Sequence, residues 1–300
     1  MRITNFLILL FIILNIFACG AKPNLSQIKV NETKIINGTE VANGQENYTS
    51  VVGLYNTKVK SICTGTLISP NAVLTAAHCV YGKSSAIKIV FSNDIDYIIY
   101  ARELDIVQTY MLQVIDYKIH PKWDPKNETV EVDTGDLAIV KFKGELPKGF
   151  VPATFLTNSN DIKLGAMVTV AGFGVNRVDM DEIEARKVKK EDIESGDVVC
   201  SNENNGKYSN CFEINRSGDG LLRTTEAPIS FIHETEIRLN EKKAGTCNGD
   251  SGGPAFIKKE NKLFLFGVTS RGSELCNDIG VYTNALYYKS WIDEILKTFK

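Results

Sequence analysis

The sequence predicts an all-β fold that ends in one α-helix. Short apolar segments bounded by turn residues recur along the chain, and this spacing favours a β-sandwich or β-barrel over the helix-linked strands of a parallel sheet. We expect strands over Ser50–Tyr55, Gly65–Ser69, Ala86–Phe91, Leu112–Ile119, Leu137–Phe142, Met167–Phe173, Leu263–Ser270 and Gly280–Thr283.

The C-terminal segment, about residues 287–299, has a different pattern. Its apolar residues fall at helical spacing, at Trp291, Ile292, Ile295, Leu296 and Phe299. A helix with this stripe packs its apolar side on the protein body, so we interpret the stripe as core rather than as a partner site.

Residues 1–19 resemble a signal peptide. Arg2 gives a positive start, and the apolar run from Phe6 to Ala18 is too short to span a bilayer but suits a signal-peptide core. We therefore expect an exported protein, either periplasmic or extracellular.

The end of this segment, from Ile16 to Gly20, resembles a bacterial lipobox around Cys19. A lipid on Cys19 would tether the precursor to a membrane. The alternative is ordinary cleavage nearby, with Cys19 incidental. The chain has seven cysteines, and in an oxidising compartment an odd number leaves one thiol for another purpose.

Composition excludes several functions. Residues 1–34 hold four basic and one acidic residue, so the remainder has 30 basic against 35 acidic residues, with no basic stripe. We therefore expect no nucleic-acid partner. No Cys-x-x-Cys or paired Cys/His spacing and no phosphate-binding glycine loop occurs, so we expect neither a metal site nor a cofactor.

The most specific motif is the segment 249–254, in which glycines flank Ser251. A serine hydroxyl becomes a nucleophile only beside a base, and the base needs a third group that fixes its tautomer. The chain offers His78, next to a cysteine that can anchor it, and Asp136, at the start of an apolar strand. The order His78, Asp136, Ser251 is that of the chymotrypsin type.

Further segments extend this likeness: 35–38, 171–174, 226–229 and 280–283, together with Cys63 and Cys79. With them the chain resembles the chymotrypsin/trypsin-type serine peptidases over about residues 35–300. The resemblance implies a monomer with two Greek-key, six-stranded antiparallel β-barrels, at about residues 36–150 and 151–285, before the C-terminal helix.

The resemblance also implies catalytic roles. His78 would take the proton of Ser251 and return it to the leaving amine, and Asp136 would orient His78. Ser270 matches the family serine that hydrogen-bonds the buried aspartate. The backbone N–H groups of Gly249 and Ser251 would form the oxyanion hole.

Two disulfides follow from the same resemblance: Cys63–Cys79, beside the catalytic histidine, and Cys247–Cys276, across the specificity pocket. Cys200 and Cys211 remain, and they pair most simply with each other.

Residues 20–34 are interpreted as a propeptide. In the family, the aspartate at the position of Asp250 receives the α-ammonium that propeptide cleavage exposes, which here would belong to Ile35 after a cut behind Lys34. The alternative for residues 35–38 is a plain strand and turn.

The primary pocket departs from trypsin. Gly245 stands where an aspartate selects basic residues, and with Thr246 and Gly280 it predicts a neutral, open pocket. We expect larger apolar or aromatic P1 residues rather than Lys or Arg, and a separate trypsin-like protease as activator. Arg271, followed by Gly272, replaces a usual tryptophan; it would point to solvent or attract an acidic side chain.

The segment 175–221 replaces a shorter family loop. Its mixed charges between Asp179 and Asp197 predict at best a solvated helix, and Cys200 to Cys211 would close a hairpin-like loop near the active-site rim. Either a surface decoration or an exosite fits this pattern.

The resulting hypothesis is a secreted serine endopeptidase, made as a zymogen and acting on protein or peptide substrates. A catalytically silent, protease-like binding protein is the main alternative. An esterase-like acyl transferase is a third, which the histidine-first order disfavours.

Overall fold

The computed structural model describes residues 36, 38–42, 45–80, 86–127, 134–204 and 207–299. The expected signal peptide and propeptide, with Cys19, Lys34 and Ile35, lie outside the described residues. No helix within the described ranges has the length and apolar character needed to cross a membrane.

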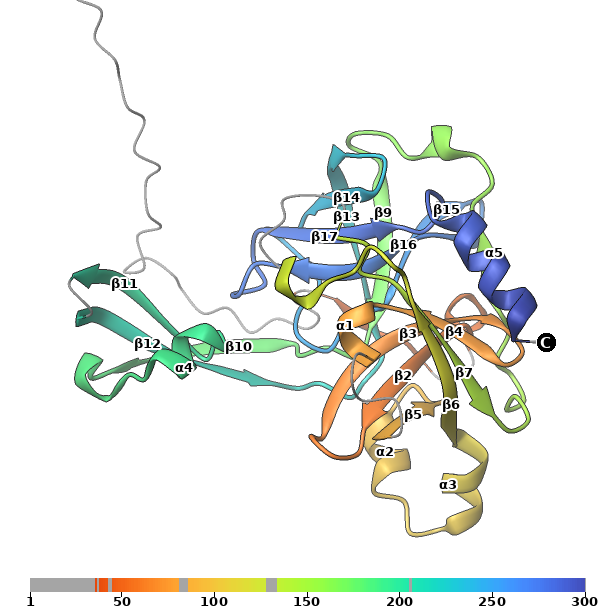
Figure 1. Cartoon of the computed structure of the whole chain (residues 1–300), viewed down its shortest axis with the longest axis horizontal. Helices are drawn as coiled ribbons and strands as arrows, with labels where there is room; N and C mark the ends of the chain where they lie inside the picture. Colours follow the sequence, from red (N-terminus) through yellow and green to blue (C-terminus); the bar gives the residue numbers. More distant parts are fainter. Residues whose placement is uncertain are drawn as a thin grey trace, which may run out of the picture.

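The first barrel contains six antiparallel strands that close in the order β2-β3-β4-β7-β6-β5 (Figure 1). Placing β4 beside β7 gives the Greek-key arrangement. Two short helices, α2 (Ile95–Ile99) and α3 (Leu104–Tyr110), join β5 to β6. The strands are β2 (Val51–Asn56), β3 (Ser61–Ser69), β4 (Ala72–Thr75), β5 (Ile87–Val90), β6 (Met111–Ile119) and β7 (Ala138–Lys143).

The second barrel has the order β13-β14-β17-β16-β15-β9 and closes because β9 also pairs with β13. Two short strands extend its sheet: β1 (Thr39–Glu40) pairs with β13, and β8 (Thr154–Phe155) pairs in parallel with β16. The two predicted six-stranded barrels are thus confirmed. The strands are β9 (Met167–Gly172), β13 (Arg223–Ile232), β14 (Glu236–Asn240), β15 (Pro254–Lys259), β16 (Lys262–Gly272) and β17 (Ile279–Asn284).

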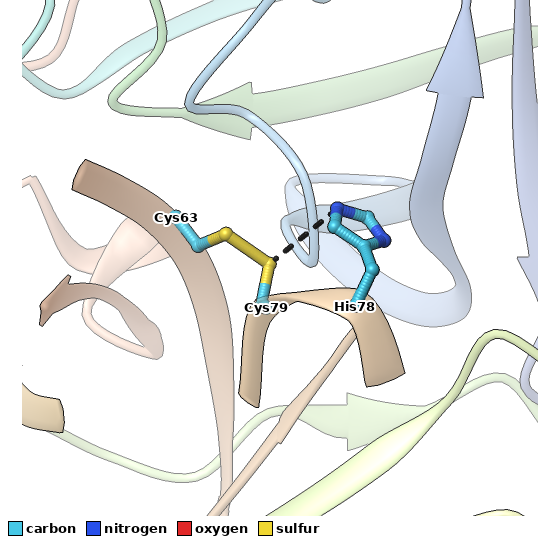
Figure 2. A group of neighbouring side chains, drawn as sticks. All are labelled: Cys63, His78 and Cys79. Carbon is cyan, nitrogen blue, oxygen red and sulfur yellow. Dashed lines mark hydrogen bonds between the residues drawn. A yellow bond between two sulfur atoms is a disulfide. The ribbon is translucent and has the colours of Figure 1, made fainter. Parts of the chain in front are cut away.

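Short helical turns lie between the strands. Helix α1 (Ala77–Val80) follows β4 directly, and the Cys63–Cys79 disulfide ties it to β3 (Figure 2). The 3-10 turns are η2 (Glu46–Tyr48), η4 (Pro125–Asn127), η5 (Ser159–Asp161) and η6 (Ala185–Lys187).

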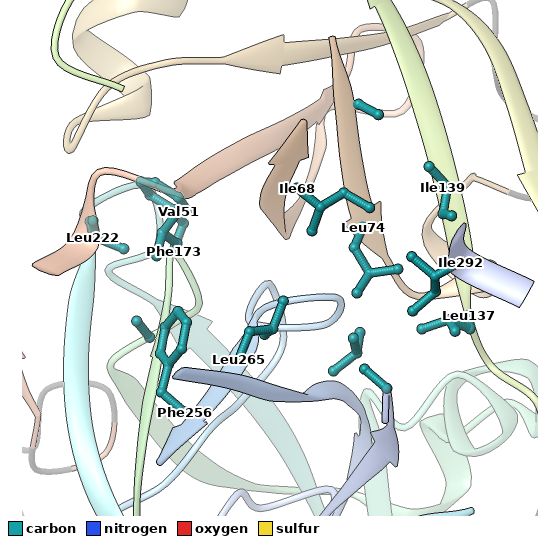
Figure 3. Packing of buried hydrophobic residues seen from close by; sticks show 14 of the residues in the cluster. Val51, Ile68, Leu74, Leu137, Ile139, Phe173, Leu222, Phe256, Leu265 and Ile292 are labelled. Carbon is teal, nitrogen blue, oxygen red and sulfur yellow. The ribbon is translucent and has the colours of Figure 1, made fainter. Parts of the chain in front are cut away.

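Each barrel has its own apolar core, and a third cluster lies between them. In this third cluster Leu74 and Ile139 of the first barrel meet Phe256 and Leu265 of the second (Figure 3). The predicted C-terminal helix is α5 (Lys289–Thr298), and its fully buried Ile292 joins this cluster. The two barrels are therefore held together by apolar packing, which fixes the groups that each contributes to the cleft.

The segment 175–221 forms a separate three-stranded sheet that extends away from the barrels (Figure 1). Its strands β10 (Arg177–Ile183), β12 (Lys207–Ser217) and β11 (Val198–Asn204) pair in the order β10-β12-β11, and helix α4 (Lys190–Glu194) precedes β11. We call this sheet, with α4, the arm. The expected Cys200–Cys211 hairpin is confirmed, while strand β10 was not predicted.

Candidate active site

His78 lies on α1, next to a disulfide that restricts the helix. Its Nε2 is 3.7 Å from Cys79 Sγ (Figure 2). Cys63, His78 and Cys79 are close enough together to suggest a metal site, but both sulfur atoms are in the disulfide. The disulfide therefore acts as an anchor for the histidine.

Asp136 precedes β7 and points at His78. Its Oδ2 is 2.9 Å from His78 Nδ1, and its Oδ1 accepts the His78 backbone N–H at 3.1 Å. Ser270 on β16 donates its hydroxyl to Oδ2 at 2.7 Å, and Thr283 on β17 donates to the Asp136 carbonyl at 3.0 Å. The second barrel thus holds the aspartate that orients a histidine of the first.

The Asp136 side chain is almost fully buried. Burial would raise the pKa of this carboxyl, but the pairing with His78 and the hydrogen bonds from His78 and Ser270 hold the pKa below its usual range. Asp136 therefore stays ionised at neutral pH and favours the Nδ1–H tautomer of His78, in which Nε2 carries the lone pair that can accept a proton.

Ser251 sits in a tight turn between the two barrels. Thr64 N–H donates to the Ser251 carbonyl at 2.8 Å, and Cys79 Sγ is 3.5 Å from the same oxygen. Gly249 and Gly252 have φ angles of 98° and 81°, a region that favours glycine. These contacts place Ser251 on the His78 side of the cleft.

The backbone N–H groups of Gly249 and Ser251, the expected oxyanion-hole donors, are positioned to bind a substrate oxygen. Among hydrogen bonds between described residues, neither the Gly249 N–H nor the Ser251 N–H has an acceptor. The Gly249 carbonyl, in contrast, is fixed by the Thr64 hydroxyl at 2.9 Å. Two N–H donors beside a serine can stabilise a developing oxyanion.

Asp250 is completely buried behind Ser251. Its oxygens accept the backbone N–H groups of Gly174 at 2.8 Å and Cys247 at 2.9 Å. Burial raises the pKa of Asp250 to about 7, against the opposing effect of these hydrogen bonds and of the Arg223 charge. Within the described ranges no lysine or arginine forms a salt bridge with it.

Ile36 packs on the chain segment that precedes Asp250. The Ile36 carbonyl accepts the Gly245 N–H at 3.1 Å, and its side chain packs against Val175, Cys247 and Cys276. Ile36, the second residue after the expected cleavage position, therefore docks on the segment whose Cys247 N–H bonds Asp250.

A cavity of about 260 Å³ opens beside Ser251, between the second barrel and the arm. It brings together four of the expected substrate-binding residues, Thr246, Ser270, Arg271 and Gly272. Ser195, Gly196 and Arg216 of the arm line its rim, as the position of the insertion predicted. A second cavity, of about 500 Å³, adjoins His78 and Asp136 and extends past Trp123 and Thr134.

Arg271 forms a salt bridge with an acidic residue that the sequence analysis did not identify. Its two terminal nitrogens lie 3.1 and 2.7 Å from the oxygens of buried Glu236. The Thr134 hydroxyl donates to the same carboxylate at 2.9 Å. In the structure, Arg271 is thus paired with an acidic residue of the protein itself.

One carboxylate next to the expected pocket residues was not predicted. Gly245 and Gly280 both face the buried side chain of Glu241, which the sequence analysis missed. Glu241 stands four residues before Gly245, on the turn after β14, so sequence spacing gave no sign that it folds back beneath the pocket. Two glycines facing each other across a pocket were the available signal, since they leave room for another side chain.

All three expected disulfides are present: Cys63–Cys79, Cys200–Cys211 and Cys247–Cys276. The sequence profile of the family described as Trypsin matches residues 35–292. The chain is also 28% identical to mouse (Mus musculus) "Serine protease 56" over 244 residues, which is 78% of this chain and 34% of that protein. The chain thus spans about a third of the length of this curated relative.

Proposed function

Because the chain belongs to the trypsin family of serine proteases, we propose that it is an active endopeptidase in which Ser251, His78 and Asp136 carry out the hydrolysis. The observation that carries this proposal is the buried Asp136, which accepts bonds from both His78 and Ser270. An ionised carboxylate that orients a histidine is the arrangement that general-base activation of a serine requires.

The chemistry follows from these positions. Ser251 Oγ attacks the carbonyl carbon of the scissile peptide bond, and its proton passes to His78 Nε2. The Gly249 and Ser251 N–H groups stabilise the tetrahedral oxyanion. As this intermediate collapses, the C–N bond breaks, His78 gives its proton to the leaving amine, and an acyl-enzyme remains.

Water completes the cycle. It attacks the ester carbonyl of the acyl-enzyme while His78 takes its proton, and the second tetrahedral intermediate collapses to the free acid. The His78 proton returns to Ser251 Oγ. Throughout, Asp136 stabilises the charged imidazole that forms in each half of the reaction.

We further propose that the protein is an exported zymogen, on the basis of residues 1–34. Cleavage after Lys34 would give Ile35 an α-ammonium group, and the docked Ile36 would bring it to Asp250. A buried carboxylate is costly without a counter-charge, so the new ammonium would stabilise the active arrangement of the turn.

A lipid on Cys19 would add a tether to this scheme. Residues 20–34 contain no cysteine, so no disulfide would hold the propeptide to the enzyme after cleavage. Activation would then also release the enzyme from the membrane. Membrane fractionation of wild type and Cys19→Ser tests this: the precursor should leave the membrane fraction in the variant.

The proposed function is tested with protein that begins at Ile35 and a fluorophosphonate probe, which reacts only with an activated serine. We expect stoichiometric labelling and hydrolysis of casein by wild type and by Ser230→Ala, an exposed control on β13. Ser251→Ala should show neither. A wild-type enzyme that the probe leaves unlabelled would instead support the catalytically silent binding protein.

A further inference from the structure

A buried carboxylate lies beneath the substrate pocket. Glu241 follows β14 and is only 2% exposed. Both of its oxygens are 3.2 Å from the hydroxyl of Thr246, and the Tyr282 hydroxyl donates to Oε1. Two hydroxyl donors aimed at one carboxyl group stabilise its ionised form.

Gly245 and Gly280 make room for this side chain. A Cβ atom at position 245 would lie 2.6 Å from both Cγ and Cδ of Glu241, and one at position 280 would lie 2.5 Å from Oε2. Neither position therefore accepts a larger residue while Glu241 holds its place. The two glycines leave the space that a carboxylate from a neighbouring turn fills.

Thr246 connects Glu241 to the substrate cavity. The cavity of about 260 Å³ runs from Ser251 to Thr246, whose hydroxyl is in contact with both Glu241 oxygens. A side chain that enters beside Ser251 and extends toward Thr246 therefore approaches the carboxylate. Thr246 thus separates the cavity from a buried carboxylate, although the residue at position 245 is a glycine.

Glu241 forms no salt bridge with another residue in the described part of the chain. Among the residues that the structure describes, no lysine or arginine forms a salt bridge with Glu241, and its nearest ionisable neighbours are Tyr282 and the acidic Asp250. An ionised carboxylate in this position is stabilised when a positive group enters the pocket.

We propose that Glu241 is the specificity-determining residue of the enzyme and that it selects substrates with Lys or Arg at P1. This inference rests on the proposed peptidase function. It replaces the expectation of an apolar P1 residue, which depended on an uncharged pocket base.

Arg216, at the rim of the cavity, does not provide a counter-charge for Glu241. Arg216 lines the cavity but donates to the carbonyls of Gly196 at 2.9 Å and Glu274 at 3.3 Å, and it lies 3.4 Å from Asp197. Its guanidinium is therefore directed at the junction between the arm and the rim. A preference for an acidic P1 residue would require Arg216 to leave these partners.

The same specificity has a consequence for activation. The residue before the proposed new N-terminus is Lys34. If the pocket accepts lysine, the mature enzyme can process its own precursor, and no separate activating protease is required. Conversion of a purified precursor should then accelerate when a trace of mature enzyme is added.

The test uses mature enzyme and fluorogenic peptides that differ only at P1, with Lys, Arg, Phe, Leu or Glu. Fluorophosphonate titration gives the concentration of reactive Ser251 in each preparation, so misfolded protein does not affect the rates. For wild type we expect kcat/KM to be highest for Lys and Arg.

Glu241→Gln keeps the shape of the side chain and removes its charge. We expect at least about a 30-fold loss of kcat/KM for Lys and Arg substrates, the loss typical of a buried charge pair that loses one partner, and less than about threefold for Phe. Glu294→Gln, an exposed control on α5, should leave all five substrates unchanged.

A double variant supplies the opposite test. Glu241→Gly removes the side chain that blocks position 245, so Gly245→Asp can then place a carboxylate in the same pocket. We expect this double variant to regain a preference for Lys and Arg over Phe.

Two results would overturn the inference while leaving the peptidase function intact: a titratable wild type that prefers Phe, Leu or Glu, or a Glu241→Gln variant that keeps its Lys and Arg preference. If fluorophosphonate does not label the wild-type enzyme, the proposed peptidase function itself is wrong, and the specificity of Glu241 is not the cause.

Discussion

Asp136, Asp250 and Glu241 are buried near the active site, and their surroundings act on these three carboxylates differently. Asp136 has a histidine and a serine as partners, which keep its pKa low. Among the described residues, Asp250 and Glu241 have only backbone N–H groups or hydroxyls at hydrogen-bond distance, so burial dominates and raises the pKa of each to about 7. Asp136 is therefore ionised without a bound cation. The ionised forms of Asp250 and Glu241, in contrast, would be stabilised by a cation that binds next to them.

Asp136→Asn tests the first of these roles. The amide would present an N–H to His78 Nδ1 and favour the wrong tautomer, so kcat should fall by about 10⁴ while folding is retained. Steady-state kinetics on a casein-derived peptide gives kcat. Asp116→Asn, which removes a half-exposed aspartate on β6, should change kcat by less than twofold; an equal loss in both variants would indicate a general effect of lost charge.

A second residue-scale prediction concerns pH. Below about pH 7 Glu241 becomes protonated and neutral, so the ratio of kcat/KM for a Lys substrate to that for a Phe substrate should rise as pH increases from 6 to 8. Protonation of His78 affects both substrates and cancels in the ratio.

Other titrating groups near Glu241 are few. Tyr282 keeps its proton, because burial and the Glu241 charge raise its pKa well above 10, and Asp250 is the remaining acidic neighbour. In Glu241→Gln the ratio should be low and independent of pH. A variant whose ratio still rises would assign the titration to Asp250.

Sequence reasoning located the triad because its residues occur in motifs of fixed order. It missed Glu241 and Glu236, since each meets its partners only through folding: Glu241 contacts Tyr282, 41 positions later, and Glu236 contacts Arg271, 35 positions later. No local pattern records such distant pairs.

Among the elements, the arm reaches the cavity beside Ser251, and one side chain cross-links it to the cavity rim. Arg216 on β12 donates to the Gly196 carbonyl inside the arm and to the Glu274 carbonyl at the pocket rim. The arm thereby becomes part of the cavity wall. This placement favours a substrate-binding role for the insertion over a decoration remote from the cleft.

Arg216→Ala should therefore raise KM with little effect on kcat. We expect a threefold to tenfold rise, equivalent to roughly 1 kcal/mol of binding free energy, because the substitution loosens the rim without touching the triad. Initial-rate kinetics on an extended peptide separates the two constants. Arg177→Ala, a half-exposed arginine on β10, is the matched control; a fall in kcat only in Arg216→Ala would contradict the role in binding.

The strands that could be predicted are those with clear apolar runs, and all eight expected segments contain observed strands. Strand β10 was missed because it has no apolar run: charged residues such as Asp179 and Asp181 alternate with Val178 and Met180. None of its residues is fully buried. Strands β13 and β14 carry Arg223 and Glu236, buried polar residues that interrupt the apolar pattern.

At the scale of the whole molecule, the two barrels form one unit around the cleft. Their shared apolar cluster fixes His78 of the first barrel relative to Ser251 and Ser270 of the second. The predicted barrels were recognisable only through the family resemblance, since alternating strands do not reveal how a sheet closes. The packing between the barrels could not be assigned from the pattern.

The zymogen proposal predicts a pH-dependent difference in stability between precursor and mature protein. With its pKa raised to about 7, Asp250 contributes stability that is complete below about pH 4 and is lost as pH rises to 7. Pairing with the Ile35 ammonium would prevent this loss. The mature protein should therefore melt at a higher temperature than the precursor at pH 7.5, and the difference should shrink at pH 5.

Differential scanning fluorimetry in a Ser251→Ala background measures this difference without self-digestion. Glu241 is present in both forms, so its own titration cancels. A chain that begins at Gly38 lacks the Ile35 ammonium and should melt like the precursor. Equal differences at pH 5 and pH 7.5 would disprove the pairing.

The most direct measurement of peptidase activity is digestion of a proteome-derived peptide library with protein beginning at Ile35, analysed by mass spectrometry beside its Ser251→Ala counterpart. We predict new peptide termini with wild type only, with Lys or Arg preceding the cleaved bonds. A library that wild type leaves intact, or that both proteins cut equally, would contradict Ser251-dependent hydrolysis by this chain.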